Sequence, residues 1–554
     1  MKRNRLVLLA LTGAMALSAA FSGCSSGNES ASTESSQTSV TAASESTSAD
    51  ISEEEEPISF TWYGNYDWFS SDSTWGTKKV GEKWILENKH VKIDFIGPNG
   101  SAQAKLATFI ASDQYPDVMI LDKGPDVEKL VSAQKIVAFD DWVDKYQGLK
   151  KEATEPVLNI LRSADGKLYQ FPNWYMPIGK TSPMNGTAGW AYVNKYYKEL
   201  GSPKLENTDD LYAYLKAVKQ KYPDVIPLMP EGPFASADII YSAFGGSPSY
   251  LNTWYAYPDG DQMKFIFDDP KFKETMVYVN KLQREKLTDS DVFTRKKETI
   301  TEKIMNKGFA MYVSGDVTNP ICTSNNNKGS IEANDPENGF TLTWPIYKEG
   351  VDKNNLILAG SDATGWNVSV ITKDAKDPER IYKFLDWLTT VEGQRILTWG
   401  EQGLYYDEVD SDGVPVLNEK YYNTPVDQLN TWGSNWVGNS LFTDIAQSRM
   451  NDQLPEDKRD WGITSRSHAA WKQQKDFTEF NSIVPLPTSP EGKVYLKIKD
   501  LVKDQFTKAY YAKSEAEVLE ICSKASQEAA KIGVDSMLQA MTDRWQKNKV
   551  ALGK

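Results

Sequence analysis

A group of aromatic and polar side chains early in the chain can bind a small polar molecule by stacking and hydrogen bonding. Residues 62–68 read Trp-Tyr-Gly-Asn-Tyr-Asp-Trp and follow an alternating apolar stretch at 58–62. A flat aromatic ring suits the C–H face of a sugar, and nearby carboxylates accept hydrogen bonds from its hydroxyls. Gly64 and Asn65 interrupt regular structure at this point. We therefore predict four ligand contacts here: Trp62, Tyr63, Asp67 and Trp68.

Other aromatic residues lie in segments without helical spacing. The chain holds 17 Trp and 27 Tyr residues, which is a large aromatic content for its length. Any single ring can pack in the core instead, and for one residue that alternative is the more common. As a set, the rings in irregular segments favour a carbohydrate ligand, and they add four predicted contacts: Trp174, Tyr175, Trp432 and Trp436.

Few side chains remain for catalysis or for metal binding. The chain has two histidines, His90 and His468, and its cysteines are Cys24, Cys322 and Cys522. This leaves little room for a zinc cluster or a Ser/His/Asp triad, and a disulfide framework is excluded. No glycine-rich phosphate motif occurs. We therefore expect no metal, no cofactor and no catalytic residue, and we leave open whether Cys322 pairs with Cys522.

The formal net charge is -14 over 554 residues. An acidic chain argues against binding nucleic acid, because nucleic-acid surfaces attract basic patches. About 500 residues follow the N-terminal region, which is more than one hydrophobic core usually organises. Two domains or lobes are therefore expected.

The N-terminus has the layout of a secretory signal. A basic start is followed by an apolar run at 6–20, which is shorter than the roughly 20 residues that cross a bilayer. Ser22 and Gly23 precede Cys24 and resemble a bacterial lipobox, although Phe21 stands where Leu is usual. We predict a signal peptide at 1–23, a lipid on Cys24, and a location on the outer face of the cell membrane.

Residues 24–56 are rich in Ser, Thr, Ala and Glu and lack aromatic residues. Such a composition cannot bury enough apolar surface to fold. We predict a disordered linker over this range. Beyond it, segments with alternating apolar residues and segments with helical spacing follow one another over 58–121. This order predicts a mostly parallel sheet covered by helices and hence an α/β fold.

Five stretches, taken in order, resemble one known family. They read DQYPDVMIL at 113–121, DGKLYQFP at 165–172, YVNKYYKELG at 192–201, GFAMY at 308–312 and KDPERIYKFLDWL at 376–388. Together they resemble the extracellular solute-binding proteins of ABC importers, of the maltose-binding-like type and its Gram-positive lipoprotein branch.

The resemblance implies a two-lobed, periplasmic-binding-protein-like α/β fold with a hinge and a ligand cleft between the lobes. It implies lobe one at 57–173 and 308–365, and lobe two at 174–307 and 366–554. The strand at 308–312 would return the chain to lobe one. Matching positions adds five ligand contacts: Asp122, Lys123, Glu231, Phe234 and Asp316. An Asp at a strand end can equally cap the next helix.

The function implied is that of a lipid-anchored, monomeric receptor that captures an oligosaccharide and delivers it to the permease subunits of an ABC importer. Two alternatives stay open. The same receptor can serve a peptide or another solute. A secreted glycoside-degrading enzyme also needs stacking aromatics and paired carboxylates.

Overall fold

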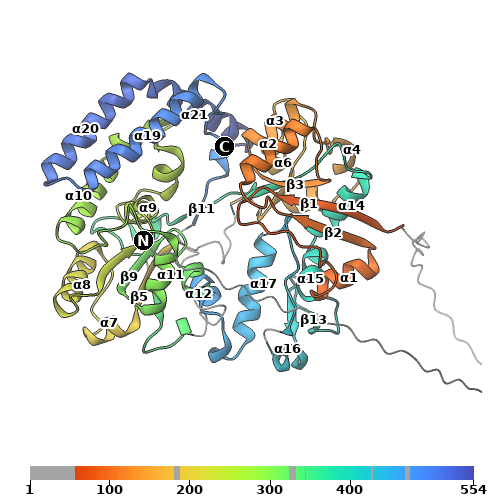
Figure 1. Cartoon of the computed structure of the whole chain (residues 1–554), viewed down its shortest axis with the longest axis horizontal. Helices are drawn as coiled ribbons and strands as arrows, with labels where there is room; N and C mark the ends of the chain where they lie inside the picture. Colours follow the sequence, from red (N-terminus) through yellow and green to blue (C-terminus); the bar gives the residue numbers. More distant parts are fainter. Residues whose placement is uncertain are drawn as a thin grey trace, which may run out of the picture. The chain divides into compact units, whose positions relative to one another are not determined.

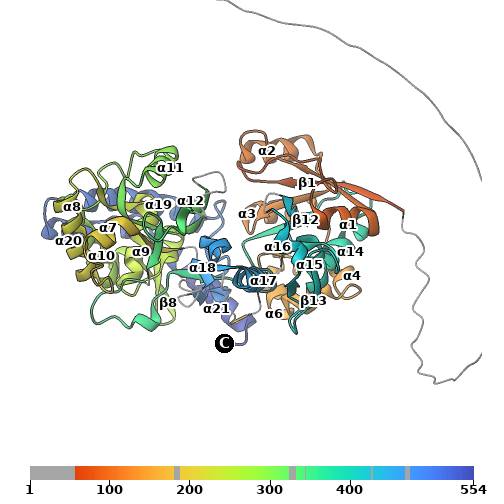
Figure 2. The same ribbon diagram turned by 90° about the horizontal axis from the view of Figure 1, so that it is seen from below.

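The computed structural model describes residues 56–554, apart from 177, 180–187, 324–331, 344, 426–427, 439 and 468–473. Residues Glu55–Lys554 form one compact unit, and it contains two sheets with separate hydrophobic cores (Figures 1 and 2). The predicted signal peptide, the lipidated Cys24 and all but the last residue of the predicted linker lie outside the described residues.

A five-stranded sheet with the order β2-β1-β3-β12-β4 is the centre of lobe one. Its parallel part pairs β1 with β2 on one side and β3 on the other, and β12 then runs antiparallel to both β3 and β4. The alternation in the sequence places every second side chain of β2 in the core. The strands are β1 (Ile58–Gly64), β2 (Val91–Ile96), β3 (Val118–Asp122), β4 (Phe171–Asn173) and β12 (Asn367–Ile371).

Helices cover this sheet and come from two distant parts of the sequence (Figure 2). The helices α1 and α15 touch closely, since a side chain at Gly81 would come within 2.2 Å of the Leu397 carbonyl oxygen. The helices of lobe one are α1 (Val80–Asn88), α2 (Ala102–Ser112), α3 (Pro125–Ser132), α4 (Asp140–Val143), α5 (Gly148–Ala153), α6 (Glu155–Leu161), α14 (Pro378–Thr389) and α15 (Val391–Trp399).

A four-stranded sheet with the order β10-β5-β9-β6 is the centre of lobe two. The strand β9 pairs antiparallel with β5 and parallel with β6, and all six of its side chains are buried. The strands are β5 (Gly189–Val193), β6 (Ile226–Pro230), β9 (Phe309–Ser314) and β10 (Phe340–Thr343).

The helices of lobe two include three long C-terminal ones that pack together in its core. The helix α8 begins with a capping box, in which Asn207 and Asp210 each bind the other's backbone N–H. The helices are α7 (Asn194–Glu199), α8 (Thr208–Lys221), α9 (Pro233–Ala243), α10 (Pro270–Arg284), α11 (Lys297–Asn306), α12 (Thr318–Thr323), α19 (Pro490–Tyr510), α20 (Glu515–Ile532) and α21 (Val534–Ala551).

The sheet topology corrects the predicted lobe boundaries between 308 and 399. The strand at 308–312 does not return to lobe one, because β9 hydrogen-bonds to β5 and β6 in lobe two. The return comes later, at β12, which pairs with β3 and β4. The side chains of α14 and α15 that follow are buried in the core of lobe one. The described residues of 308–358 therefore belong to lobe two, and residues 366–399 belong to lobe one.

Smaller elements complete the chain. The strands β11 (Ala359–Ser361) and β15 (Gln474–Asp476) pair in parallel, and a third small core contains Trp399, Tyr406 and Phe442. The remaining strands and α-helices are β7 (Ala256–Asp259), β8 (Gln262–Phe265), β13 (Tyr406–Val409), β14 (Pro415–Leu417), α16 (Glu419–Asn423), α17 (Ser440–Gln453) and α18 (Trp461–Ser465). A π-helix spans Tyr250–Trp254, and 3₁₀ turns span Ile266–Asp268, Lys353–Asn355, Glu456–Lys458 and Thr478–Phe480.

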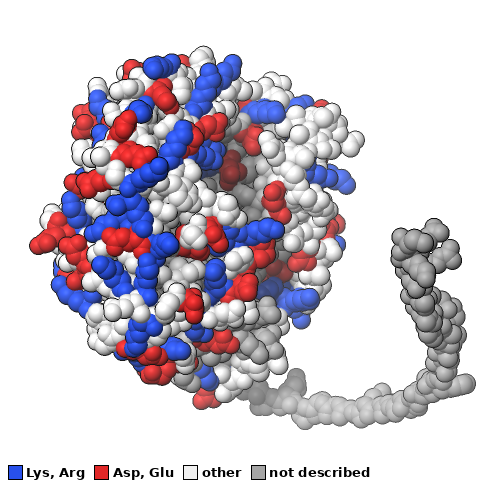
Figure 3. All heavy atoms as spheres, turned by 60° about the vertical axis from the view of Figure 1, so that its left-hand side comes forward, with Lys and Arg blue, Asp and Glu red and all other residues white. Residues whose placement is uncertain are grey.

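Acidic and basic side chains are intermingled over the face shown in Figure 3, which is hollowed near its upper edge. Within the described ranges, none of the helices is both long enough and apolar enough to span a bilayer. The charge pattern on this face is typical of a surface that faces water.

Candidate ligand-binding site

Four aromatic side chains meet at one edge of the lobe-one sheet, and we call them the aromatic platform: Tyr66, Trp68, Trp366 and Trp436. The Tyr66 and Trp68 rings stack with centroids 5.0 Å apart and planes 18° apart. The Trp68 and Trp366 rings stack at 6.1 Å and 21°. Trp436 adjoins Trp68 at 6.0 Å, and Tyr66 adjoins Trp366 at 5.4 Å.

The sheet explains why these rings come together. Asp122, the last residue of β3, lies opposite Asn367, the first residue of β12, because the two strands are antiparallel. The backbone N–H of Asn65, just after β1, donates to the Ile120 carbonyl at 3.0 Å. The loop after β1 and the residue before β12 therefore share one edge of the sheet, the edge at which α/β proteins commonly bind ligands.

The exposure of the platform is unusual for large apolar rings. Trp68 is 57% exposed and Trp366 is 47% exposed. Adjacent exposed indoles keep apolar surface in water without any gain from burial, so such a patch usually marks a binding surface. Their faces are suited to stacking on a flat apolar face of a ligand.

Carboxylates border the platform. The Tyr66 hydroxyl donates to Asp122 Oδ1 at 2.6 Å, and burial together with this hydrogen bond raises the pKa of Tyr66 above its ordinary value. Asp67 accepts the Ala102 backbone N–H at 2.8 Å, at the start of α2. Both Asp67 and Asp122 are exposed, so they retain lone pairs that can accept hydrogen bonds from a ligand's hydroxyl groups.

The Lys123 ammonium is directed to protein groups, so its predicted contact with a ligand is not supported. Its ammonium donates to Asp362 Oδ2 at 3.0 Å, to Thr364 Oγ1 at 2.5 Å and to the Gly365 carbonyl. An ammonium has three N–H groups, so these partners use all of them. The Lys123 side chain is only 14% exposed. It holds the segment that precedes Trp366.

The C-terminal region supports the same segment. The Asn481 amide donates to Asp362 Oδ2 at 2.8 Å and to Thr364 Oγ1 at 2.6 Å. Asn548 in α21 in turn donates to the Asn481 carbonyl at 2.7 Å. A chain of hydrogen bonds therefore links the last helix to the base of the platform.

Buried Asn173 joins three segments beneath the platform. Its carbonyl accepts the Trp366 N–H at 2.8 Å, and its side chain donates to Asn367 Oδ1 at 2.9 Å. Its Oδ1 accepts the Gly438 N–H at 2.8 Å, next to the segment that carries Trp436. Gly365 lies against the same residue with φ +76°. These contacts fix Trp366 and Trp436 relative to each other.

Three predicted ligand contacts are core residues instead. Trp62, Tyr63 and Tyr175 are 0% exposed, and Trp62 stacks on Phe95 at 5.8 Å. Burial raises the pKa of Tyr63 to about 12. For Trp62 and Tyr63 the prediction is wrong because both are residues of β1, which runs to Gly64. Tyr175 follows β4 and is buried in the core of lobe one.

Trp174 and Trp432 lie outside the platform. Trp174 is partly buried directly after β4 and has φ 56°. Trp432 is 39% exposed and lies edge-on against Trp399 at 5.5 Å. The structure therefore brings together only Trp68 and Trp436 of the predicted aromatic contacts.

The predicted contacts of lobe two have structural partners. Glu231 follows β6 and accepts from the Ser314 hydroxyl. Phe234 packs 4.6 Å from Phe506 in the core, so its predicted stacking on a ligand is not supported. Asp316 accepts from the Asn319 backbone and side chain at 3.2 and 2.8 Å, as a helix-capping residue does. None of the three belongs to the platform.

Trp366 is a member of the platform that the sequence does not predict. It is a single Trp between Gly365 and the strand β12, whereas most of the predicted rings lie near other aromatic residues. Trp366 precedes the amino end of β12, and this end lies at the ligand edge because β12 runs antiparallel to β3. The residues of β12 alone do not indicate that direction.

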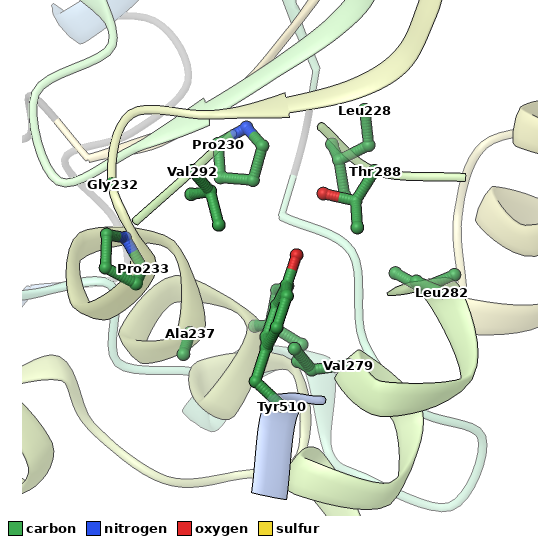
Figure 4. Close-up of a pocket in the computed structure, with 11 residues that line it drawn as sticks. Leu228, Pro230, Gly232, Pro233, Ala237, Val279, Leu282, Thr288, Val292 and Tyr510 are labelled. Atoms are coloured by element: carbon green, nitrogen blue, oxygen red, sulfur yellow. The ribbon is translucent and has the colours of Figure 1, made fainter. Parts of the chain in front are cut away.

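A small apolar cavity lies in the core of lobe two, and none of its lining residues belongs to the platform (Figure 4). Leu228 and Pro230 of β6 form one wall. The Tyr510 side chain from α19 projects into it with its hydroxyl directed toward Thr288. Its apolar lining within the core makes it a packing feature of the lobe.

In the part of the chain that the structure describes, no three His, Cys, Asp or Glu side chains gather closely enough to hold a metal ion. The sequence does not decide whether Cys322 and Cys522 pair, and the structure has both as free thiols. Burial raises the pKa of Cys322 to about 12 and that of Cys522 to about 11. Both groups are therefore protonated near neutral pH and are poor nucleophiles.

Comparison with known sequences identifies relatives over much of the chain. A family model described as bacterial extracellular solute-binding protein matches residues 72–395. The fructooligosaccharide ABC transporter substrate-binding protein FusA of Streptococcus pneumoniae serotype 4 is 26% identical over 339 residues. That alignment covers 57% of this chain and 59% of the relative, which is less than two thirds of the relative's length.

Solved structures share the fold. The calcium-free alginate-binding protein AlgQ2 superimposes with a TM-score of 0.60 at 18% identity, covering 89% of this chain and 98% of that one. The S. pneumoniae FusA EF-hand mutant in complex with fructo-nystose gives a TM-score of 0.61 at 16% identity, covering 89% and 100%. These likenesses confirm the predicted two-lobed α/β fold.

Proposed function

The chain belongs to the bacterial extracellular solute-binding protein family, and on this premise we propose that it captures an oligosaccharide and, as a monomer, delivers it to the permease subunits of an ABC importer. The observation that carries the ligand class is the stacked pair of exposed indoles, Trp68 and Trp366. Stacked rings of this kind suit the C–H faces of sugar units.

The names of the relatives support the same ligand class. The curated relative is named for fructooligosaccharide, and a structural neighbour is named for alginate. Both names are saccharides of more than one unit. A platform of several rings offers stacking to more than one sugar unit, which fits a ligand of that length.

Binding without catalysis is the second part of the proposal. The Asp122 carboxylate is engaged by Tyr66, and the two cysteine thiols outside the N-terminal region are buried or partly buried. A receptor needs a site that closes on its ligand and no group that transfers a proton to it.

A thermal-shift screen over saccharides and peptides tests the ligand class. A ligand present at 100 times its Kd should stabilise the protein by about 2.7 kcal/mol, which is measured as a rise in Tm. We expect at least one oligosaccharide to raise Tm and to be recovered intact after incubation. Cleavage products would instead indicate a glycoside-degrading enzyme, and a response to peptides alone would indicate a receptor for another solute.

We also propose that the protein is held on the outer face of the cell membrane by lipid on Cys24. The basic start, the apolar run and the small residues before Cys24 support this location. A single acyl chain binds membranes only marginally, so the proposal requires more than one chain on the cysteine.

Replacing Cys24 with alanine should release the protein into the culture medium, because the acyl chains are what bind the membrane. Immunoblots of cell and medium fractions measure the change. Cys322→Ala is the matched control and should leave the protein with the cells. A Cys24→Ala protein that stays with the cells would contradict the anchor.

A further inference from the structure

Two lysines on segments next to the platform residues donate hydrogen bonds to protein groups. Lys123 gives all three of its N–H groups to Asp362, Thr364 and the Gly365 carbonyl. Lys79 donates to the Thr431 carbonyl at 2.9 Å, in the segment that leads to Trp436. A ligand carboxylate would have to displace these partners before it could pair with the Lys123 ammonium.

A third lysine lies on the helix that Asp67 caps. Lys105 is on α2, and its ammonium lies 5.0 Å from the centroid of the Phe109 ring. Its position over this ring is a cation–π contact on the helix surface. Lys79, Lys105 and Lys123 are thus directed to protein partners.

The acidic groups at the same edge are exposed and only partly engaged by protein groups. Asp67 and Asp122 are exposed, and each has one oxygen with a protein partner. A carboxylate has about four lone-pair sites, so each retains capacity for a hydroxyl donor. A sugar hydroxyl can donate to these oxygens, whereas a ligand carboxylate would meet like charge at them.

We propose that the sugar unit stacked on Trp68 and Trp366 is uncharged, so that the ligands are neutral oligosaccharides and oligouronates are rejected. This inference rests on the proposed function and specifies the substrate class of the same site. Rejection follows from the protein's charge arrangement, because the aromatic faces alone would accept a neutral sugar and a uronate alike.

Isothermal titration calorimetry on the whole protein tests the inference. The neutral probes are fructo-, xylo-, malto- and manno-oligosaccharides, and the charged probes are oligogalacturonate and oligomannuronate of the same lengths. We expect at least one neutral probe to bind, and each oligouronate to bind at least about tenfold more weakly than the best neutral probe, because the like charges are close.

The outcomes separate the two claims. An oligouronate that binds as tightly as the best neutral probe would overturn the inference and leave the oligosaccharide receptor standing. Failure of every saccharide to bind would overturn the proposed function and this inference with it.

Replacing Asp122 with asparagine provides a second measurement. Asp122→Asn removes one negative charge at nearly constant shape, so the affinity ratio of oligouronate to neutral probe should rise at least about threefold. Asp224→Asn, which changes an exposed carboxylate in the turn before β6 of lobe two, is the matched control and should leave the ratio unchanged. An unchanged ratio in Asp122→Asn would contradict the assigned cause.

Discussion

Replacing Trp366 with alanine should weaken oligosaccharide binding by about thirtyfold, or about 2 kcal/mol, which is the usual effect of removing a central aromatic contact. Trp366 stacks on Trp68 and is 47% exposed, so its ring offers a free face to the ligand. Because half of the side chain is already in water, the melting temperature should change little. Calorimetry and thermal unfolding measure the two effects separately.

Trp432→Ala is the matched control for this variant. Trp432 is also a partly exposed tryptophan, at 39%, but it contacts Trp399 and not the platform. We expect it to keep the affinity of the unaltered protein. Equal losses in the two variants would show that the platform is not the binding surface, and loss in Trp432→Ala alone would place the site beside Trp399.

Replacing Gly365 with alanine should destabilise the protein by about 3 kcal/mol or more and abolish measurable binding. A Cβ at this position would lie 2.2 Å from the Asn173 carbonyl oxygen, which is backbone and cannot rotate away. The residue also has φ +76°, a conformation that costs about 1–2 kcal/mol with a side chain. Relief of the clash must separate Trp366 from Asn173, so the platform is disrupted along with the fold.

Gly350→Ala separates these two causes. Gly350 has φ +88° and nothing within 4 Å of a built Cβ, so alanine there should show the conformational cost alone. Chemical denaturation of both variants measures the difference in the free energy of unfolding. If the two variants lost equal stability, the close approach of Gly365 to Asn173 would contribute nothing to the change in the free energy of unfolding.

The sequence predicted the elements of lobe one better than their ends. The alternation at 58–62 identified β1, but the strand runs to Gly64. This difference of two residues places Tyr63 in the strand and not in the loop that follows it. Strand ends are weakly marked in sequence because the apolar alternation and the loop both tolerate aromatic residues.

The membership of β9 could not be decided from its own residues. All six side chains of the strand are buried, so its apolar run fits the centre of either sheet. The family resemblance was right about the fold, yet the strand was assigned to the wrong lobe. Only the pairing with β5 and β6 settles its place.

The candidate site depends on contacts between distant residues. Trp68 and Trp436 were predicted, but Trp366, which completes the platform with Tyr66, was not. Lys123 was correctly placed at the end of β3 but not correctly oriented, since its partners lie more than 200 residues away. Propensity and spacing describe neighbours along the chain, and such partners are set by the tertiary fold.

The position of β12 has a consequence for the order in which this protein can fold. It lies between β3 and β4, so this part of the sheet cannot form until Asn367 pairs with Asn173, which is 194 residues earlier in the chain. Such distant pairing is slow, because long loops must close before the contacts form. Trp366 directly precedes β12, so it is positioned when that strand pairs. The last strand of the sheet and the ligand platform should therefore form in one kinetic step, and the recovery of sugar binding during refolding should report the completion of lobe one.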